Sequence, residues 1–282
     1  MVEPAMRFRF AILLTFTLLM VIASAPATTK DDKAAAAHLS KGMVLAEGGD
    51  TVGAIAEYRK ALKIKPDYAD AHNNLGLALQ KKKDYDGAIA EYREALRLEP
   101  DDAVVHFNLG IALRAKGDLT GAITEYSKAI ELAPDLAEAR SNLGAMLDDR
   151  GDFAGAIEQY RAVLRAYPNQ AIPHNNLGSV LFKMREVEAA IAEYRQAIKL
   201  KPAYAVAHFN LGLALCDKGD VDGGMVEYEE ALRLNPDHAK THYYLGKALE
   251  LKGHPDEAAR EYAEAQHLDP RLKPPITSQV KK

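Results

Sequence analysis

The chain contains no tryptophan and only one cysteine, Cys216, so no intrachain disulfide can form. A single thiol is more typical of a tolerated small apolar residue than of a catalyst. The sequence also lacks a phosphate-binding loop, a serine or cysteine in a nucleophile setting, the spacing of metal ligands and a glycine-rich dinucleotide turn. These absences argue against an enzyme and predict a protein that uses no cofactor and no metal.

A strong excess of positive charge is absent as well. The net charge is -4, and the one short basic run, Lys81 to Lys83, is interpreted as a solvated turn between helices. We therefore expect no nucleic-acid partner. The apolar residues are dominated by alanine and leucine, which are strong helix formers, so the composition favours a helical body.

What the chain does have is a unit that returns every 34 residues. Prolines mark the period: Pro66, Pro100, Pro134, Pro168, Pro202, Pro236 and Pro270. Glycines keep the same step: Gly42, Gly76, Gly110, Gly144, Gly178, Gly212 and Gly246. So do tyrosines: Tyr58, Tyr92, Tyr126, Tyr160, Tyr194, Tyr228 and Tyr262. The period is therefore fixed by residue identity and not only by hydrophobicity.

The framework of one unit, with Leu75, Gly76, Ala88, Tyr92 and its closing proline, resembles the tetratricopeptide repeat. The resemblance implies an all-α, right-handed superhelical solenoid of seven helix-turn-helix repeats with a concave binding surface. The predicted organisation is a linker at 28–34, repeats at 35–68, 69–102, 103–136, 137–170, 171–204, 205–238 and 239–272, and a tail at 273–282.

Residues 1–27 differ from the repeats. Arg7 and Arg9 precede an uncharged apolar run, a pattern typical of a secretory signal, and small residues allow cleavage after Ala27. The alternative is an uncleaved membrane anchor formed by residues 8–25. In either case we expect the repeats to be exported, to the periplasm or beyond the cell, with membrane contact only through an uncleaved N-terminal segment.

Local signals predict where the helices begin and end. A glycine followed by an aspartate is expected to end the first helix of a unit and cap the second, as at Gly117–Asp118, Gly151–Asp152 and Gly219–Asp220. Asp67 is a candidate N-cap for the first helix of its unit. Pro173 is expected to delay the start of its helix, and Gly223 with Gly224 to lower helix stability locally.

A column of asparagines precedes the framework leucine in five consecutive units: Asn74, Asn108, Asn142, Asn176 and Asn210. Asparagine is a mediocre helix former, so the column requires an explanation beyond propensity. Its amide donates and accepts, and can hold both polar groups of one peptide unit. First helices about 10 Å apart would engage roughly every third residue of an extended strand. The alternative is that these amides bond neighbouring helices or water.

Specificity is expected from residues beside this column, and four apolar ones are candidate peptide anchors: Phe107, Ile111, Phe209 and Leu213. The column resembles the tetratricopeptide array of O-linked N-acetylglucosamine transferases, whose asparagine ladder holds extended substrates. The likeness stops at the array and implies no transferase activity. The leading basic residue of the terminal-carboxylate clamp found in chaperone-binding members is absent, so that partner is not expected.

Two further columns carry ionisable groups. Histidine recurs at His38, His72, His106, His174, His208 and His242, with Arg140 in the remaining unit. Neighbours about 10 Å apart cannot share a metal, so packing is favoured, with titration near pH 6 as a second interpretation. Glutamate recurs before the tyrosine at Glu57, Glu91, Glu125, Glu193, Glu227 and Glu261, and predicts a solvated stripe.

Two functions are compatible with these features. The first is a non-catalytic scaffold that binds an extended peptide or protein partner in its groove. The second is an accessory subunit that presents substrates to a separate glycosyltransferase or envelope-assembly complex. Pro274 and Pro275 oppose a closing helix, so the last apolar face is expected to be open and to permit self-association.

Overall fold

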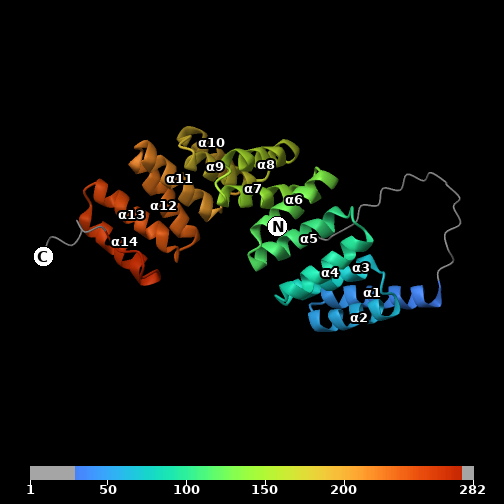
Figure 1. Ribbon diagram of the computed structural model, residues 1–282. Coiled ribbons are helices and arrows are strands. Elements are labelled where there is room, and N and C mark those ends of the chain that lie inside the picture. Colours follow the sequence, from blue (N-terminus) through green and yellow to red (C-terminus); the bar gives the residue numbers. More distant parts are fainter. Residues whose placement is uncertain (1–28, 275–282) are drawn as a thin grey trace, which may run out of the picture.

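The computed structural model describes residues 29–274, which form fourteen helices and no strand. The helices are α1 (Lys30–Glu47), α2 (Thr51–Ile64), α3 (Ala69–Lys81), α4 (Tyr85–Leu98), α5 (Ala103–Lys116), α6 (Leu119–Leu132), α7 (Ala137–Asp149), α8 (Phe153–Ala166), α9 (Ala171–Lys183), α10 (Val187–Leu200), α11 (Ala205–Lys218), α12 (Val221–Leu234), α13 (Ala239–Leu251) and α14 (Pro255–Leu268). They stack as seven pairs into a curved solenoid (Figure 1). The all-α repeat fold expected from the sequence is confirmed.

The segment interpreted as a signal or an anchor, residues 1–27, lies outside the described residues, as does most of the tail. Within residues 29–274, no helix combines the length and the hydropathy needed to cross a membrane.

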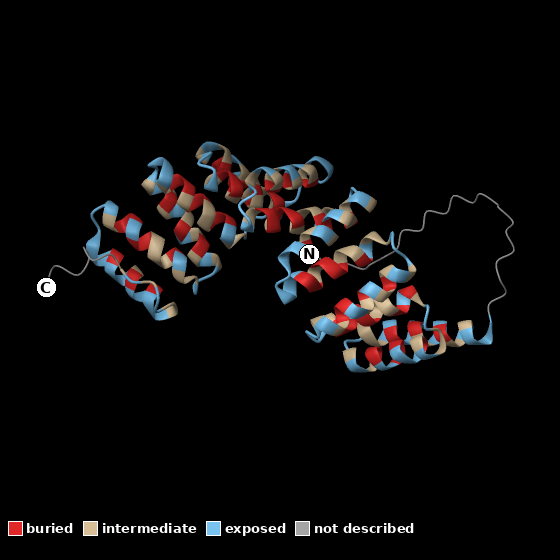
Figure 2. Ribbon diagram, in the orientation of Figure 1, coloured by how far each residue is buried: buried red, intermediate tan, exposed pale blue. Residues whose placement is uncertain are grey.

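Each pair is held together by the framework glycine and tyrosine. The Tyr92 ring lies so close to Gly76 that a β-carbon on the glycine would stand 2.6 Å from the ring. Tyr92 itself is fully buried. The ring therefore packs on the glycine of its own unit. Buried residues line the interfaces between helices along the whole solenoid (Figure 2).

The turn inside each pair follows the predicted chemistry. Gly117 adopts a left-handed conformation with φ of 85°, and the Asp118 carboxylate accepts a hydrogen bond of 2.9 Å from the Gly121 N–H. Gly151 and Gly219 are left-handed as well, each followed by a capping aspartate. These helix boundaries were therefore readable from the sequence.

Two local predictions were wrong. Asp67 does not cap α3. The N-cap of α3 is Tyr68, whose side chain makes no capping hydrogen bond. The Asp67 carboxylate instead pairs with Arg97 at 3.3 Å. Pro173 does not delay α9, which begins two residues earlier at Ala171, because a proline in the first turn removes no intrahelical hydrogen bond.

The C-terminal face bears on the predicted self-association. On α14, Ala259 and Gln266 occupy the positions at which α12 carries Met225 and Leu232. Those two side chains of α12 pack against the C-terminal hydrophobic cluster. Within residues 29–274, no large exposed apolar side chain lies on α14. The outer face of α14 thus carries small and polar residues at these positions, and self-association through the C-terminal end stays a prediction.

The odd-numbered helices form the inner wall of the curve. Beyond their own pair partners, α1 touches α3, α3 touches α5, α7 touches α9, α9 touches α11, and α11 touches α13. Direct contact between first helices of successive units means that these helices converge on the concave side. The asparagine and apolar columns of the sequence lie on these helices.

Candidate functional site

The concave wall carries the asparagine column, but its members differ in how available they are. Asn108 is only 4% exposed, and its amide donates to the Asn73 side-chain oxygen at 3.1 Å. Asn210 donates in the same way to Asn175 at 3.0 Å. These two amides tie the first helix of one unit to that of the preceding unit. For them, the alternative of bonds between neighbouring helices describes the structure.

The other three asparagines are half-buried. Asn74 donates to the Asp70 carbonyl of its own helix at 2.7 Å. Asn176 accepts a hydrogen bond of 3.3 Å from Asn175. Asn142 makes no side-chain hydrogen bond within residues 29–274 and is half-exposed on α7. Asn142 therefore has the greatest unused hydrogen-bonding capacity in the column.

The four apolar candidates are also half-buried, and each packs against the hydrophobic core. Phe107 lies 5.9 Å from Tyr126, measured between ring centroids, and Ile111 packs beside it on α5. Phe209 lies 5.9 Å from Tyr244, and Leu213 faces the same C-terminal cluster. These side chains combine support for the core with a partly accessible surface toward the groove.

A hollow of about 550 Å3 opens among α9, α11 and α13. Of the nine residues selected from the sequence, only Leu213 lines it. The other residues that define its chemistry come from later turns of the same helices and from α12: Phe182, Lys183, Arg185, Cys216, Asp217, Tyr228, Tyr244, Lys247 and Leu251. Most of them lie six to nine residues beyond the asparagine position, where no column of identical residues draws attention to them.

Burial determines the electrostatic state of two groups in the hollow. It raises the pKa of the Cys216 thiol, which keeps this cysteine protonated and weakly nucleophilic near neutral pH. It also raises the pKa of the Tyr228 hydroxyl. Neither group is activated for chemistry, so the hollow is suited to binding.

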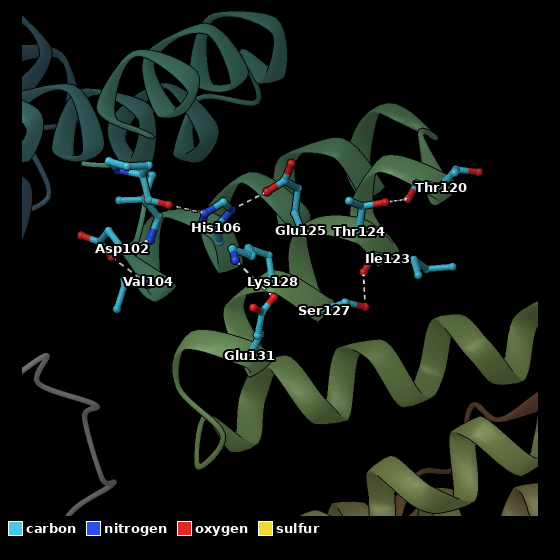
Figure 3. Close-up of polar contacts among 12 residues, drawn as sticks. Asp102, Val104, His106, Thr120, Ile123, Thr124, Glu125, Ser127, Lys128 and Glu131 are labelled. Carbon is cyan, nitrogen blue, oxygen red and sulfur yellow. Dashed lines mark hydrogen bonds and ion pairs between the residues drawn. The ribbon is translucent and has the colours of Figure 1, made fainter. Parts of the chain in front are cut away.

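The histidine column forms a repeated polar clamp. His106 Nδ1 lies 2.6 Å from Glu125 Oε2, and His106 Nε2 lies 2.9 Å from the Pro100 carbonyl oxygen (Figure 3). The same two contacts recur in four other units, at His72, His174, His208 and His242. Each histidine thus joins the two helices of its unit to the turn that precedes them.

This clamp corrects the interpretation of both columns. The glutamates do not form a solvated stripe, because each accepts a hydrogen bond from a histidine and Glu57 is only 4% exposed. The histidines lie between the two helices, as the packing interpretation predicted, yet they act by forming hydrogen bonds. Within residues 29–274 no group of three or more histidine, cysteine, aspartate or glutamate side chains is arranged to hold a metal.

The unit without the histidine keeps the same connections. Arg140 Nε donates to the Pro134 carbonyl at 2.8 Å, and a terminal guanidinium N–H donates to Gln159 Oε1 at 3.0 Å. Arginine replaces histidine in the one unit in which glutamine replaces glutamate. Both versions place a side chain with two available nitrogens between a carbonyl and a second oxygen acceptor.

The geometry defines a helical-repeat protein with a concave inner wall, and the sequence comparisons agree. Family models described as "TPR repeat" match residues 42–83, 186–219 and 212–253. Models described as "Tetratricopeptide repeat" match residues 73–137, 107–171 and 239–272. The chain belongs to the tetratricopeptide repeat family. No curated protein matches it.

Several solved structures share the fold. The MamA crystal structure is 31% identical, covers 58% of this chain and 95% of its own, and has a TM-score of 0.53. PilF of Pseudomonas aeruginosa is 25% identical over 78% of this chain and 100% of its own, with a TM-score of 0.68. YrrB, described as a TPR protein with an unusual peptide-binding site, is 23% identical over 64% of this chain and 92% of its own, with a TM-score of 0.53. The likeness to YrrB shows the fold alone.

Proposed function

We propose that the protein is a non-catalytic scaffold that holds an extended segment of a protein partner along its concave wall. The observation that carries this proposal is the row of half-buried polar and apolar side chains on the odd-numbered helices, which widens into the hollow at α9, α11 and α13. A folded surface normally leaves few such concave sites, and this one combines an apolar lining with a few polar groups, as peptide sites do.

The asparagine column contributes to this function unequally. Asn142 and Asn176 are half-exposed and can bond the backbone of a bound strand, which reads an extended shape and not a particular sequence. Asn108 is buried and bonded to Asn73, so it supports the wall instead of touching a partner.

The test is binding of a library of extended, unstructured peptides to the repeat region, with dissociation constants measured by fluorescence anisotropy. Asn142→Ala combined with Asn176→Ala is expected to weaken binding by about 0.5–1.5 kcal/mol for each lost hydrogen bond. The matched control is Thr124→Ala with Ser127→Ala on α6, because both hydroxyls are exposed and bond only carbonyls of their own helix. If both double variants bind peptides equally well, the two asparagines do not contact the bound peptide. If the wild-type repeat region binds no peptide at all, the proposed scaffold function is wrong.

We also propose that the scaffold acts outside the cytoplasm, which rests on the N-terminal pattern of residues 1–27. A fusion of the full chain to a reporter enzyme that is active only after export tests this. Activity that persists when Arg7, Arg9 and the apolar run are deleted would contradict it.

A further inference from the structure

The hollow among α9, α11 and α13 has an apolar floor and a charged rim. Leu213, Tyr228 and Tyr244 contribute the floor, and Leu251, 75% exposed, continues it toward solvent. A volume of about 550 Å3 lies within the usual range of ligand sites, roughly 300–1,000 Å3. It can accept one or two large apolar side chains.

The cations on the rim are not equally neutralised. The Lys183 ammonium lies 2.8 Å from both carboxylate oxygens of Asp148. Arg185 donates to the Asp217 carboxylate at 3.3 Å. Both cations are therefore paired within the protein.

Lys247 is the exception. Its ammonium lies 5.6 Å from the centroid of the Tyr244 ring, and none of the ion pairs among residues 29–274 includes it. A lysine held against an aromatic ring that also forms part of an apolar floor places one uncompensated positive charge beside the space for an apolar side chain. The complementary ligand carries a carboxylate next to an apolar group.

We propose that the hollow binds an internal peptide segment in which a large apolar residue is followed or preceded by an aspartate or glutamate, the apolar side chain filling the floor and the carboxylate meeting Lys247. This rests on the proposed scaffold function and specifies its partner. Successive residues of an extended strand are about 3.3 Å apart along the chain and their side chains point to opposite faces, so one of two adjacent side chains can face the floor while the other faces the rim at Lys247.

The chain provides its own reporter for this site. Cys216 is the only cysteine and lines the hollow. A peptide seated there shields the thiol, so the rate of its reaction with a maleimide falls. The control is Ser127→Cys in a Cys216→Ser background, which places the thiol on exposed α6.

The probes are N-acetylated, C-amidated dodecapeptides of glycine and serine with one central pair: Phe-Glu, Phe-Lys or Ser-Glu. We expect Phe-Glu to protect Cys216 at concentrations about fivefold lower than Phe-Lys, and Ser-Glu to protect least. Lys247→Gln removes the difference between Phe-Glu and Phe-Lys, and Lys247→Glu reverses it. Leu251→Ser weakens both Phe peptides alike.

The outcomes separate the two proposals. If all three peptides protect Cys216 equally, or Lys247 variants leave the order unchanged, the groove binds peptides without this preference and only the present inference fails. If Phe-Glu with a free C-terminal carboxylate protects but its amidated form does not, the site takes a chain terminus and the internal-segment inference is overturned. If neither these probes nor the peptide library binds, both proposals fail.

Discussion

The histidine clamp makes a prediction whose size follows from its contacts. Both ring nitrogens of His106 face oxygen acceptors, Glu125 and the Pro100 carbonyl, and only a doubly protonated imidazole donates to both. His106→Phe keeps an aromatic ring in the space but removes both donors. It leaves the Glu125 carboxylate, 23% exposed, without its partner.

The expected loss combines two terms. A hydrogen bond to a charged group contributes about 1.5–3 kcal/mol and a neutral one about 0.5–1.5 kcal/mol, so His106→Phe should lower the free energy of unfolding by about 2–4 kcal/mol. The double variant His106→Arg with Glu125→Gln copies the natural pair Arg140 and Gln159. It should lose less than about 1 kcal/mol, because it restores a two-donor side chain opposite two acceptors.

The assay is urea unfolding followed by circular dichroism, with hydrogen exchange of α5 and α6 to localise the effect, because repeat units can open separately. His267→Phe, at an exposed position on α14, is the control. Equal stability of wild type and His106→Phe, or a loss in the Arg/Gln variant as large as in the Phe variant, would refute the reasoning.

Two further predictions concern a framework glycine and the stability of the protein at acidic pH. Gly110→Ala should lower the free energy of unfolding by about 1–3 kcal/mol, because the new β-carbon would stand 2.7 Å from the fully buried Tyr126 ring. The control is Gly48→Ala, which should leave stability unchanged because the nearest neighbour of its β-carbon is 3.4 Å away. Thermal unfolding compares the two variants. The bond from Lys60 is the chief cause that lowers the pKa of Glu57 to about 2. The stabilisation from the Glu57 carboxylate is therefore present above pH 4.5, the ordinary pKa of this group, and is lost as pH falls toward 2. A carboxyl NMR titration of wild type and Lys60→Ala tests this, because the Glu57 midpoint should rise in the variant.

The fold was predictable because its determinants are local and repeated. Gly76 must be small since Tyr92 lies on it, and Gly117 must tolerate a positive φ since the chain turns there. Each such requirement appears seven times or nearly so. A single unit would have left several interpretations open, whereas the columns leave one.

The clamp was missed because its partners are 19 residues apart on different helices. The type of residue alone suggested a solvated glutamate. The chain nevertheless contained a signal: the one unit with Arg140 in the histidine column is the one with Gln159 in the glutamate column. Paired exchange of this kind indicates contact, since a glutamine offers the same acceptor oxygen without the charge.

The asparagine column shows why identity does not reveal exposure. Asn108 and Asn142 occupy the same position in consecutive units, yet Asn108 is 4% exposed and Asn142 is half-exposed. The difference arises from the neighbour one unit earlier, where Asn73 supplies an acceptor for Asn108. A pattern that treats each unit separately cannot contain this information.

Repetition itself limits where specificity can lie. Residues that recur in all seven units or in six of them, such as the framework tyrosines and the clamp histidines, are used in holding the pairs together, and the tyrosines are buried. Positions on the inner wall that differ between units are less constrained by this packing. Three residues after the asparagine position, the wall carries in turn Leu77, Ile111, Ala145, Ser179, Leu213 and Lys247. A partner that distinguishes this solenoid from another of the same fold must read that changing series, and Leu213 and Lys247 at its end line the hollow.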